Sequence, residues 1–566
     1  MLTNSPIVRS PAARALFFVC AAVSVAILLW AHYLGLHGTS GLTMIFFVLF
    51  ATFDYSAAGG ALIILIAAAL IARPSWLRPV ARWVGDHPVV VAACCAAILA
   101  AGTLIVYRNH PLSMDEYAPF FQAQVFASGH LTGRFPAPAL NWLVPANFQN
   151  YFLYVSHTTG EVASAYWPSF ALLLTPFMWL GIPWVCNAAI SAMTVVAVHR
   201  LALKIFASRE AAGFAALLTV ASPVFFADGI SYYSMSAHLL ANTVFVLLLL
   251  EPTAKKAFVA GVVGSIALTL HNPVPHFLFA LPWIVWLAMR PGGIRLTAWL
   301  SAGYVPLCVI LGLGWFVLTR GLVEHPAGQL AGAQDLLKGS FVLPNSNVLF
   351  ARLIGLAKIW VWAVPGLVIL AGLGAWRLRG DVRCRLLALS ALLTFFGYFF
   401  VSFDQGHGWG FRYFHSAWSV LPVLAAGALT VSRTGLRSDN AGEGSFLDEQ
   451  TRAFVAACAL LTLTLGIGQR ALQIHEFISD DLTQVPDYPG KEQRVILLDA
   501  RYSFYGADLV QNDPWLREPA IRMLSHGVPA DAAMMRDQFP SFHRVYADDH
   551  GEVWSVSGQP LASAPR

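Results

Sequence analysis

The sequence predicts an all-α polytopic membrane protein of about 13 transmembrane helices, followed by a small α+β domain outside the membrane. Composition is the first reason: 57% of the 566 residues are hydrophobic and 11% are charged, whereas soluble domains are about 25% charged. Secondly, apolar stretches long enough to cross a bilayer recur from Arg14 to about Leu472. Thirdly, the segment from residue 473 onward has no such stretch and is expected to fold in water.

The expected spans follow one another with short polar or basic connections between them. An additional apolar piece, 168–182, is expected to dip into the membrane without crossing it. The first span is expected to be retained, because no small-residue cleavage site follows it. The spans are expected at 14–34, 42–72, 88–106, 184–206, 211–227, 234–250, 256–271, 275–289, 296–318, 349–376, 384–402, 411–431 and 453–471.

Lysine and arginine are distributed unequally between the two sides that this count defines. Basic residues mark the cytoplasmic side of a membrane protein, and one side here collects most of them. The loop 107–183, the loop 320–348, the connection 403–411 and the tail 473–566 then lie on the outer face of an inner (plasma) membrane. The side predicted to be cytoplasmic carries Arg9, Arg14, Arg73, Arg78, Arg82, Arg200, Lys204, Arg209, Lys255, Lys256, Arg290, Arg295, Arg377, Arg379, Arg383, Arg385, Arg433, Arg437 and Arg452.

The tail is expected to be a small α+β domain. A buried strand is predicted at 495–498, a helix around 518–525, and a strand pair at 545–547 and 553–556. The cytoplasmic connections contain neither a GxxxxGK[ST] loop nor a GxGxxG motif. A nucleotide-driven activity and a nucleic-acid partner are therefore not expected, and function is sought on the outer face.

Two adjacent carboxylates open the first outer loop, in the run Ser113-Met114-Asp115-Glu116-Tyr117. They follow a span closely, so they are expected at the boundary between lipid and water. A carboxylate held in a fixed position can act as a general base. The alternative is a pair of solvated surface carboxylates, which would give the same sequence pattern. A downstream run, Tyr166-Trp167-Pro168, precedes the apolar piece that ends at Gly181.

These motifs resemble the first outer loop of the GT-C superfamily of integral membrane glycosyltransferases, especially its protein O-mannosyltransferase and lipid A aminoarabinose transferase branch. The resemblance covers most of residues 88–472 and leaves 1–87 as a two-span extension. It implies that Asp115 is the catalytic carboxylate, which would act as the base, and Glu116 is a candidate for orienting the acceptor or a divalent metal ion. It also implies a polyprenyl-phosphate sugar donor and a glycan, lipid or protein acceptor. Tyr117 is a candidate for sugar contact or for packing.

A second acid, Asp228, follows a span on the outer side. In the resembled family an acid in this connection shares the active site, whereas a turn or helix-cap aspartate ahead of Gly229 is the structural alternative. Asp54 lies inside or beside an apolar stretch, where an unpaired charge is costly. It precedes the family-like region and is given no catalytic role.

The connection 403–413, which reads FDQGHGWGFRY, is rich in glycine and aromatic residues. Glycines let a backbone approach a ligand closely. Arg412 is a candidate for holding the donor phosphate, and His407 for substrate contact. The alternative for Arg412 is an interfacial arginine that reaches toward lipid headgroups.

Weaker candidates are His271, at a helix break, and Lys358, near the outer interface. A structural histidine and a membrane-anchoring lysine are the alternatives. No residue cluster decides whether a divalent metal ion takes part. The sequence thus predicts transfer of a sugar from a lipid phosphate, with a transporter or flippase of lipid-linked saccharides, or a non-catalytic assembly protein, as rivals.

Overall fold

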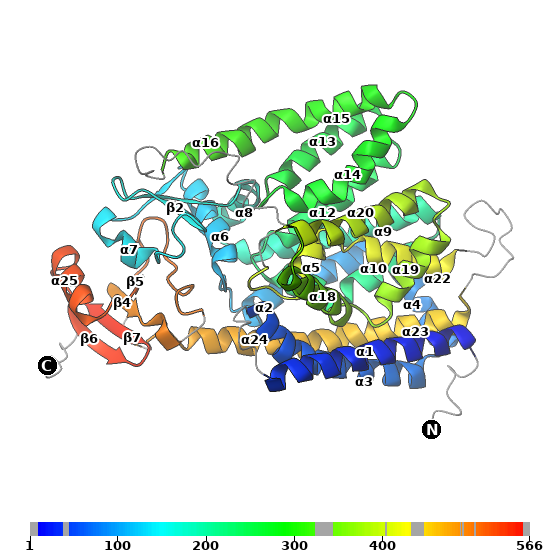
Figure 1. The fold of residues 1–566 in the computed structure, drawn as a ribbon, viewed down its shortest axis with the longest axis horizontal. Helices are drawn as coiled ribbons and strands as arrows, with labels where there is room; N and C mark the ends of the chain where they lie inside the picture. Colours follow the sequence, from blue (N-terminus) through cyan, green and yellow to red (C-terminus); the bar gives the residue numbers. More distant parts are fainter. Residues whose placement is uncertain are drawn as a thin grey trace.

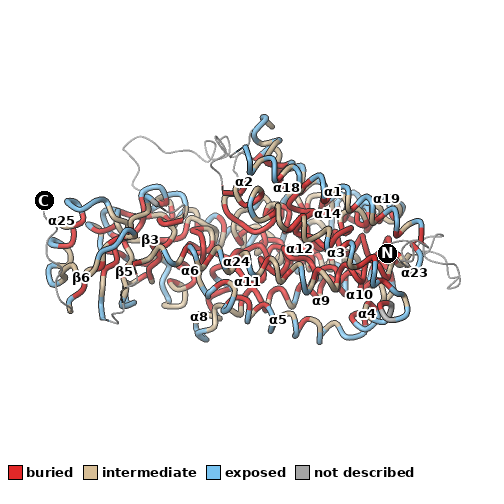
Figure 2. Tube along the Cα trace, turned by 90° about the horizontal axis from the view of Figure 1, so that it is seen from below, coloured by how far each residue is buried: buried red, intermediate tan, exposed pale blue. Residues whose placement is uncertain are grey.

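The structure is a computed structural model that describes residues 10–37, 45–322, 343–401, 405–431, 447–486, 488, 492–502 and 505–557. A long body of helices is joined at one end to a smaller part that holds the two sheets (Figure 1). Buried residues run through the interior of both parts (Figure 2). The predicted residues 403 and 404, the basic residues 9, 433 and 437, and most of the loop 320–348 lie outside the described ranges.

The first half of the body begins with the segment predicted as a two-span extension, in which α1 packs against α3 and both pack against α23. Helix α4 is amphipathic and packs against α10 and α23. The elements are α1 (Pro11–His37), α2 (Ile45–Leu49), η3 (Phe50–Asp54), α3 (Tyr55–Ile71), α4 (Pro74–Asp86), α5 (Pro88–Ile105), α9 (Cys186–Phe206), α10 (Arg209–Val220), α11 (Pro223–Ile230) and α12 (Met235–Leu249).

The second half of the body ends in a helix that continues through α23, η8 and α24 and reaches the sheet-containing part (Figure 1). The elements are α13 (Ala254–Leu268), α14 (Val274–Met289), α15 (Gly293–Leu307), η6 (Cys308–Gly314), α16 (Trp315–Arg320), α18 (Ser346–Val361), α19 (Leu367–Arg377), α20 (Val382–Gly397), η7 (Tyr398–Phe400), α21 (Arg412–His415), α22 (Val420–Thr430), α23 (Glu449–Leu461), η8 (Thr462–Gly466) and α24 (Ile467–Leu482).

Within the described ranges, seven helices are long and apolar enough to cross a membrane. Five apolar helices are shorter, and α10 and α11 form one further candidate span that is bent by 60°. Helix α8 (Ser169–Trp179), within the apolar piece 168–182, is 11 residues long, or about 16 Å, which is too short to cross the hydrocarbon core. The helical membrane-protein class is confirmed, while the count of about 13 spans and the orientation remain predictions.

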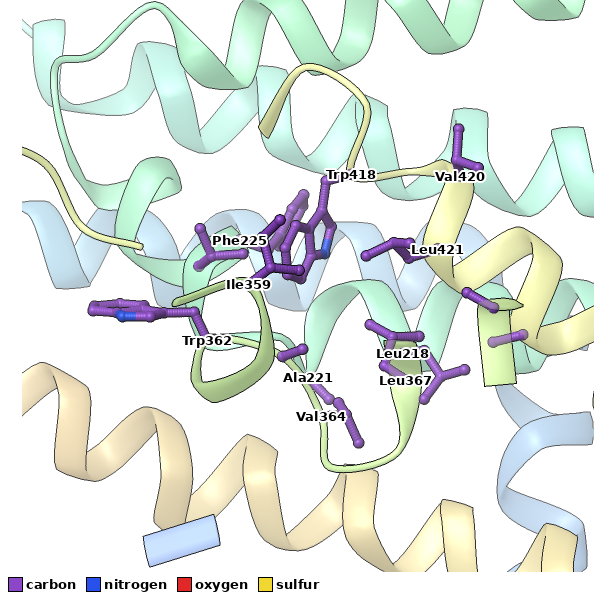
Figure 3. Packing of buried hydrophobic residues seen from close by; sticks show 14 of the residues in the cluster. Leu218, Ala221, Phe225, Ile359, Trp362, Val364, Leu367, Trp418, Val420 and Leu421 are labelled. Carbon is purple, nitrogen blue, oxygen red and sulfur yellow. The ribbon is translucent and has the colours of Figure 1, made fainter. Parts of the chain in front are cut away.

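Three spans were predicted as continuous helices, and for these the prediction was wrong. The range 211–227 is divided between α10 and α11, 349–376 between α18 and α19, and 411–431 between α21 and α22. Two of the breaks are joined by a backbone hydrogen bond, in which the Val224 N–H donates to the Trp362 carbonyl at 3.2 Å. Buried side chains from all three broken regions lie close together, with Trp418 among them and Trp362 at the edge of the group (Figure 3). Breaks that hydrogen-bond to one another are tolerated inside a membrane.

The C-terminal domain contains a four-stranded sheet in the order β5-β4-β7-β6, with β4 and β5 parallel. The strands are β4 (Arg494–Leu498), β5 (Ala520–Leu524), β6 (His543–Asp548) and β7 (Gly551–Ser555), and α25 (Val528–Gln538) follows β5. Three predicted strands are confirmed, whereas the helix predicted around 518–525 is wrong. Ile521 and Met523 point into the core and their neighbours do not, which is the period of a strand.

The loop 107–183, which was predicted to lie on the outer face, packs directly on this domain. It holds α6 (Met114–Ala127), β1 (Gly133–Arg134), η4 (Ala137–Ala139), α7 (Leu140–Leu143), β2 (Leu153–Val155), β3 (Glu161–Ser164) and α8, and η5 (Pro183–Val185) ends it. Met114, Tyr117 and Phe121 of α6 belong to one hydrophobic cluster with Val495 and Met523 of the sheet. The loop and the C-terminal domain therefore share a core.

Candidate active site

Asp115 and Arg412 form an ion pair, although 297 residues separate them in the sequence. The Arg412 Nη2 donates to Asp115 Oδ2 at 2.7 Å. The second carboxylate oxygen accepts a hydrogen bond from the Tyr166 hydroxyl. The Asp115 side chain is 18% exposed and the Arg412 side chain 6% exposed, so the aspartate is the partly exposed member of the pair.

The connection that carries Arg412 is shaped around its side chain. The backbone N–H of Arg412 donates to Gln405 Oε1 at 2.9 Å, and its Nη2 also donates to the Gln405 carbonyl. The guanidinium lies 4.4 Å from the centre of the Tyr233 ring. Gly408 has φ +146° and faces the Arg412 side chain so closely that a Cβ there would overlap it. The glycine thus lets the arginine pack against its own connection.

Asp115 lies in the first turn of α6, where backbone N–H groups and the helix dipole favour a negative charge. Burial alone would raise the pKa of Asp115, but the Arg412 guanidinium, His271 and the Tyr166 hydroxyl together bring it below the usual value. The group is therefore a carboxylate at neutral pH. It is an anion that is both held in place and accessible.

Glu116 is completely buried and its oxygens are occupied by protein donors. Oε1 accepts from the Tyr232 N–H at 2.8 Å, and Oε2 accepts from the Tyr107 hydroxyl at 3.0 Å and the Leu112 N–H at 3.1 Å. Burial raises the pKa of Glu116 to about 8, although these donors favour the charged form. These contacts give Glu116 a role in joining α6 to neighbouring segments.

Asp228 is also completely buried, and its contact is with a histidine rather than with Asp115 or Arg412. Its Oδ2 lies 2.8 Å from His415 Nδ1. His415 is in α21, the short helix that starts at Arg412. The structure therefore places Asp228 next to the last residue of the short helix that starts at Arg412.

His271 and His407 lie on either side of the ion pair. The His271 ring centre is 4.1 Å from that of Tyr166, and burial lowers the pKa of His271 to about 4. His407 Nδ1 is 3.0 Å from the Tyr233 hydroxyl, and burial together with Arg412 lowers the pKa of His407. Both imidazoles are therefore neutral at pH 7, and His271 is the one that is partly exposed.

Tyr117 and Lys358 make contacts elsewhere. The Tyr117 hydroxyl donates to the Asn512 carbonyl at 2.5 Å and accepts from the Asn512 N–H at 2.8 Å, so it joins α6 to the C-terminal domain. Lys358 Nζ donates to Asp54 Oδ2 at 2.7 Å, and both side chains are buried. The lysine predicted near the outer interface is thus the partner of a buried carboxylate.

Four residues at this site were not predicted as site residues: Tyr166, Tyr233, Gln405 and Asp508. Tyr166 was part of a quoted motif, and Gln405 belongs to the glycine-rich connection. Asp508, from the C-terminal domain, accepts a hydrogen bond from the Met114 N–H at 2.8 Å. No local sequence signal identifies Tyr233 or Asp508, because their contacts join segments far apart in the chain.

An apolar groove is linked to the site through Tyr166. It has a volume of about 570 Å³ and runs between the end of α6, α8 and the helix Gly293–Arg320. Trp315, in its wall, donates from Nε1 to the Tyr166 carbonyl at 2.9 Å, and Tyr166 bonds to Asp115. Among the described side chains, no group of three or more His, Cys, Asp or Glu residues is placed to hold a metal ion.

The helical body and the sheet-containing part together resemble the fold of ArnT, a GT-C glycosyltransferase of solved structure. The predicted resemblance is confirmed at the level of the fold by comparison with solved structures. ArnT from Cupriavidus metallidurans bound to undecaprenyl phosphate has a TM-score of 0.52 and 13% sequence identity, over 84% of this chain and 99% of that chain. ArnT is a lipid A aminoarabinose transferase of the GT-C class.

The apo structure of ArnT from Cupriavidus metallidurans gives a TM-score of 0.48 at 14% identity, over the same 84% and 99% of the two chains. No family model and no curated protein matches the sequence. The likeness to ArnT with bound undecaprenyl phosphate establishes the fold alone. The chemistry has to be argued from the site itself.

Proposed function

We propose that this protein is an integral membrane glycosyltransferase that moves a sugar from a polyprenyl-phosphate-linked donor to a glycan, lipid or protein acceptor at the outer membrane face. The observation that carries the proposal is the accessible Asp115–Arg412 pair on a GT-C fold. The undecaprenyl phosphate bound to ArnT supports a donor of this kind. The apolar groove beside Tyr166 has the lining that a lipid chain requires.

In the proposed displacement, the acceptor atom bonds to the anomeric carbon while the bond from that carbon to the phosphate oxygen breaks. The acceptor proton passes to Asp115, which is ionised and therefore able to receive it. The bonding electrons stay with the departing phosphate. Transfer thus needs an anion that takes a proton and a cation that meets the phosphate, and the pair supplies both.

Arg412 has the capacity to bind the phosphate. A guanidinium carries five N–H donors in a fixed fork. Its Nη2 engages Asp115 and Gln405, whereas its Nε–H has no hydrogen-bond partner among the described residues. The donor phosphate would exchange with Asp115 for Nη2, which stabilises the leaving group and frees the carboxylate to act as a base.

The test follows the carrier rather than the unidentified sugar. The purified protein in lipid nanodiscs is incubated with a membrane extract of polyprenyl-phosphate sugars and acceptors, and the carrier is followed by mass spectrometry. We expect the sugar-linked carrier to decrease while free polyprenyl phosphate accumulates, relative to nanodiscs without the protein. A flippase would leave the mass of every carrier species unchanged, and that outcome would overturn the proposal.

A further inference from the structure

The segment Tyr505–Asn512 of the C-terminal domain, here called the clamp segment, lies between β4 and β5 and reaches the start of α6. Asp508 Oδ1 accepts from the Met114 N–H at 2.8 Å. Gln511 Nε2 donates to the Pro111 carbonyl at 2.6 Å. Asn512 exchanges two backbone hydrogen bonds with the Tyr117 hydroxyl. Four bonds from one short segment thus hold the turn that carries Asp115.

The same segment also touches the connection that carries Arg412. The Tyr505 ring meets the His407 ring edge-on, with 5.1 Å between centres, and lies 5.8 Å from the Phe477 ring. His407 in turn contacts the Tyr233 hydroxyl, and the Tyr233 ring lies under the Arg412 guanidinium. One end of the clamp segment therefore contacts His407, close to Arg412, and the other end contacts α6, which carries Asp115.

The bond from Asp508 meets a specific need of α6. The first backbone N–H groups of a helix have no partner within the helix. Ser113, at the N-cap position, forms no side-chain capping bond, and Met114 is the first residue of the helix. Asp508 therefore supplies, from another domain, the acceptor that a local cap usually provides. Because Asp115 is the next residue, the direction of its side chain depends on this turn.

We propose that the clamp segment sets the position of Asp115 relative to Arg412, with Asp508 as the positioning residue, so that the C-terminal domain is part of the active site. The effect of the clamp segment on catalysis rests on the proposed function. Its role in holding the first turn of α6 does not. A displacement of about 1 Å of a catalytic group can reduce the rate by about 100-fold. The shared core of α6 and the sheet gives the clamp segment a rigid base.

The first test compares Asp508→Ala with Asp508→Asn in the full-length protein in nanodiscs, by hydrogen exchange of peptides that cover residues 113–117. The alanine variant loses the acceptor for the Met114 N–H, whereas the asparagine variant keeps an oxygen there. We expect at least tenfold faster exchange in the alanine variant and near wild-type exchange in the asparagine variant. Asp549→Ala, at an exposed position in the same domain, is the matched control and should change nothing.

The second test measures transfer from the extract of polyprenyl-phosphate sugars. We expect Asp508→Ala to lower kcat at least tenfold with little change in KM for the donor, and Asp508→Asn to recover most of the rate. Gln511→Ala, which removes a neighbouring bond, should give a smaller loss and serves if Asp508→Ala does not fold. Unchanged exchange in Asp508→Ala and Gln511→Ala, or equal damage from Asp508→Asn and Asp508→Ala, overturns the proposal. If the wild type transfers no sugar but Asp508→Ala still loosens α6, the proposed function fails and the clamp stands.

Discussion

Asp54 and Asp115 each bond to basic side chains from late parts of the chain, but in different surroundings. Asp54 bonds to Lys358 Nζ, Arg470 Nη2 and Trp362 Nε1, each at 2.7 Å. Asp54 is 1% exposed and shares its charge between two cations. Asp115 has one cation and one tyrosine hydroxyl as partners and is 18% exposed. Proximity of opposite charges therefore does not by itself identify a catalytic site in this protein.

The difference between the two clusters indicates what each can do. Ions buried in a membrane protein are stable only when paired, and the Asp54 cluster joins the two-span extension to α18 and α24. A ligand cannot reach it without separating packed helices. In the proposed function the Asp115–Arg412 pair exchanges partners with a phosphate or a hydroxyl, because the Asp115 side chain is partly exposed. Burial thus separates the structural cluster from the proposed catalytic one.

The largest expected effect is on transfer by Asp115→Asn. The amide keeps the size of the side chain but cannot accept a proton, so we expect the rate to fall by about 10² to 10⁴-fold. The thermal unfolding midpoint should remain close to that of the wild type. Transfer assays and thermal unfolding in the same nanodiscs measure both quantities. A large drop in the unfolding midpoint would instead make Asp115 a second structural carboxylate.

Asp54→Asn should show the opposite pattern. It leaves Lys358 and Arg470 as buried cations without a counter-charge, and breaking a buried pair costs about 3 to 5 kcal/mol of stability. We expect a lower unfolding midpoint and less folded protein, with an unchanged transfer rate per folded molecule. Adding Lys358→Met to Asp54→Asn should restore part of the stability. Loss of transfer at unchanged stability would move this cluster into the active site.

Arg412→Lys should have a smaller effect than loss of the base. A lysine keeps the positive charge but loses the planar fork that binds a phosphate through two bonds. Removing one transition-state donor lowers rates by about 10² to 10³-fold, and the retained charge should limit the loss to the lower end of that range. Arg412→Gln, which loses the charge as well, should be worse. Equal transfer by Arg412→Lys and the wild type would assign the arginine to packing.

The sequence predicted what depends on local composition. Long apolar runs located α1, α5 and α9 well, and a carboxylate just outside a span pointed to Asp115. The breaks near Trp362 and Val224 were not predictable, because each is satisfied by a backbone group from another helix. The pattern of apolar residues does not show such hydrogen bonds between separate helices.

Long-range pairing limited the prediction of the site in the same way. Lys358 was predicted near the outer interface. Nothing in the neighbouring sequence indicates that its partner is Asp54, which lies 304 residues away. Asp54 was recognised as too costly to leave unpaired, which is a local argument, but its partners could not be named. Ile521 was predicted in a helix, because the alternation of buried and exposed residues around it covers only five residues. Pairing with the parallel strand β4 makes this segment a strand.

Glu116→Gln should have the smallest effect on stability at neutral pH. It extends the comparison of buried and exposed carboxylates to a second residue of α6. Glu116 adjoins Asp115 but resembles Asp54 in being buried and bonded only to the protein. Its pKa is about 8 in the folded protein, above the ordinary value of 4.5. The folded state therefore holds a proton that the unfolded state loses between these values. The stability that this group contributes is present below about pH 4.5 and is lost as the pH rises through about 8.

Thermal unfolding of the wild type and of Glu116→Gln between pH 5 and 9 measures this contribution. We expect the wild-type midpoint to fall over this range and the variant midpoint to fall less, because its side chain stays neutral. Part of the slope should remain in the variant, since burial also raises the pKa of Asp508 to about 8. Parallel curves for the two proteins would mean that the hydrogen bonds from Tyr107, Leu112 and Tyr232 keep Glu116 ionised. Glu116 would then be a buried anion like Asp54, held by neutral donors instead of cations.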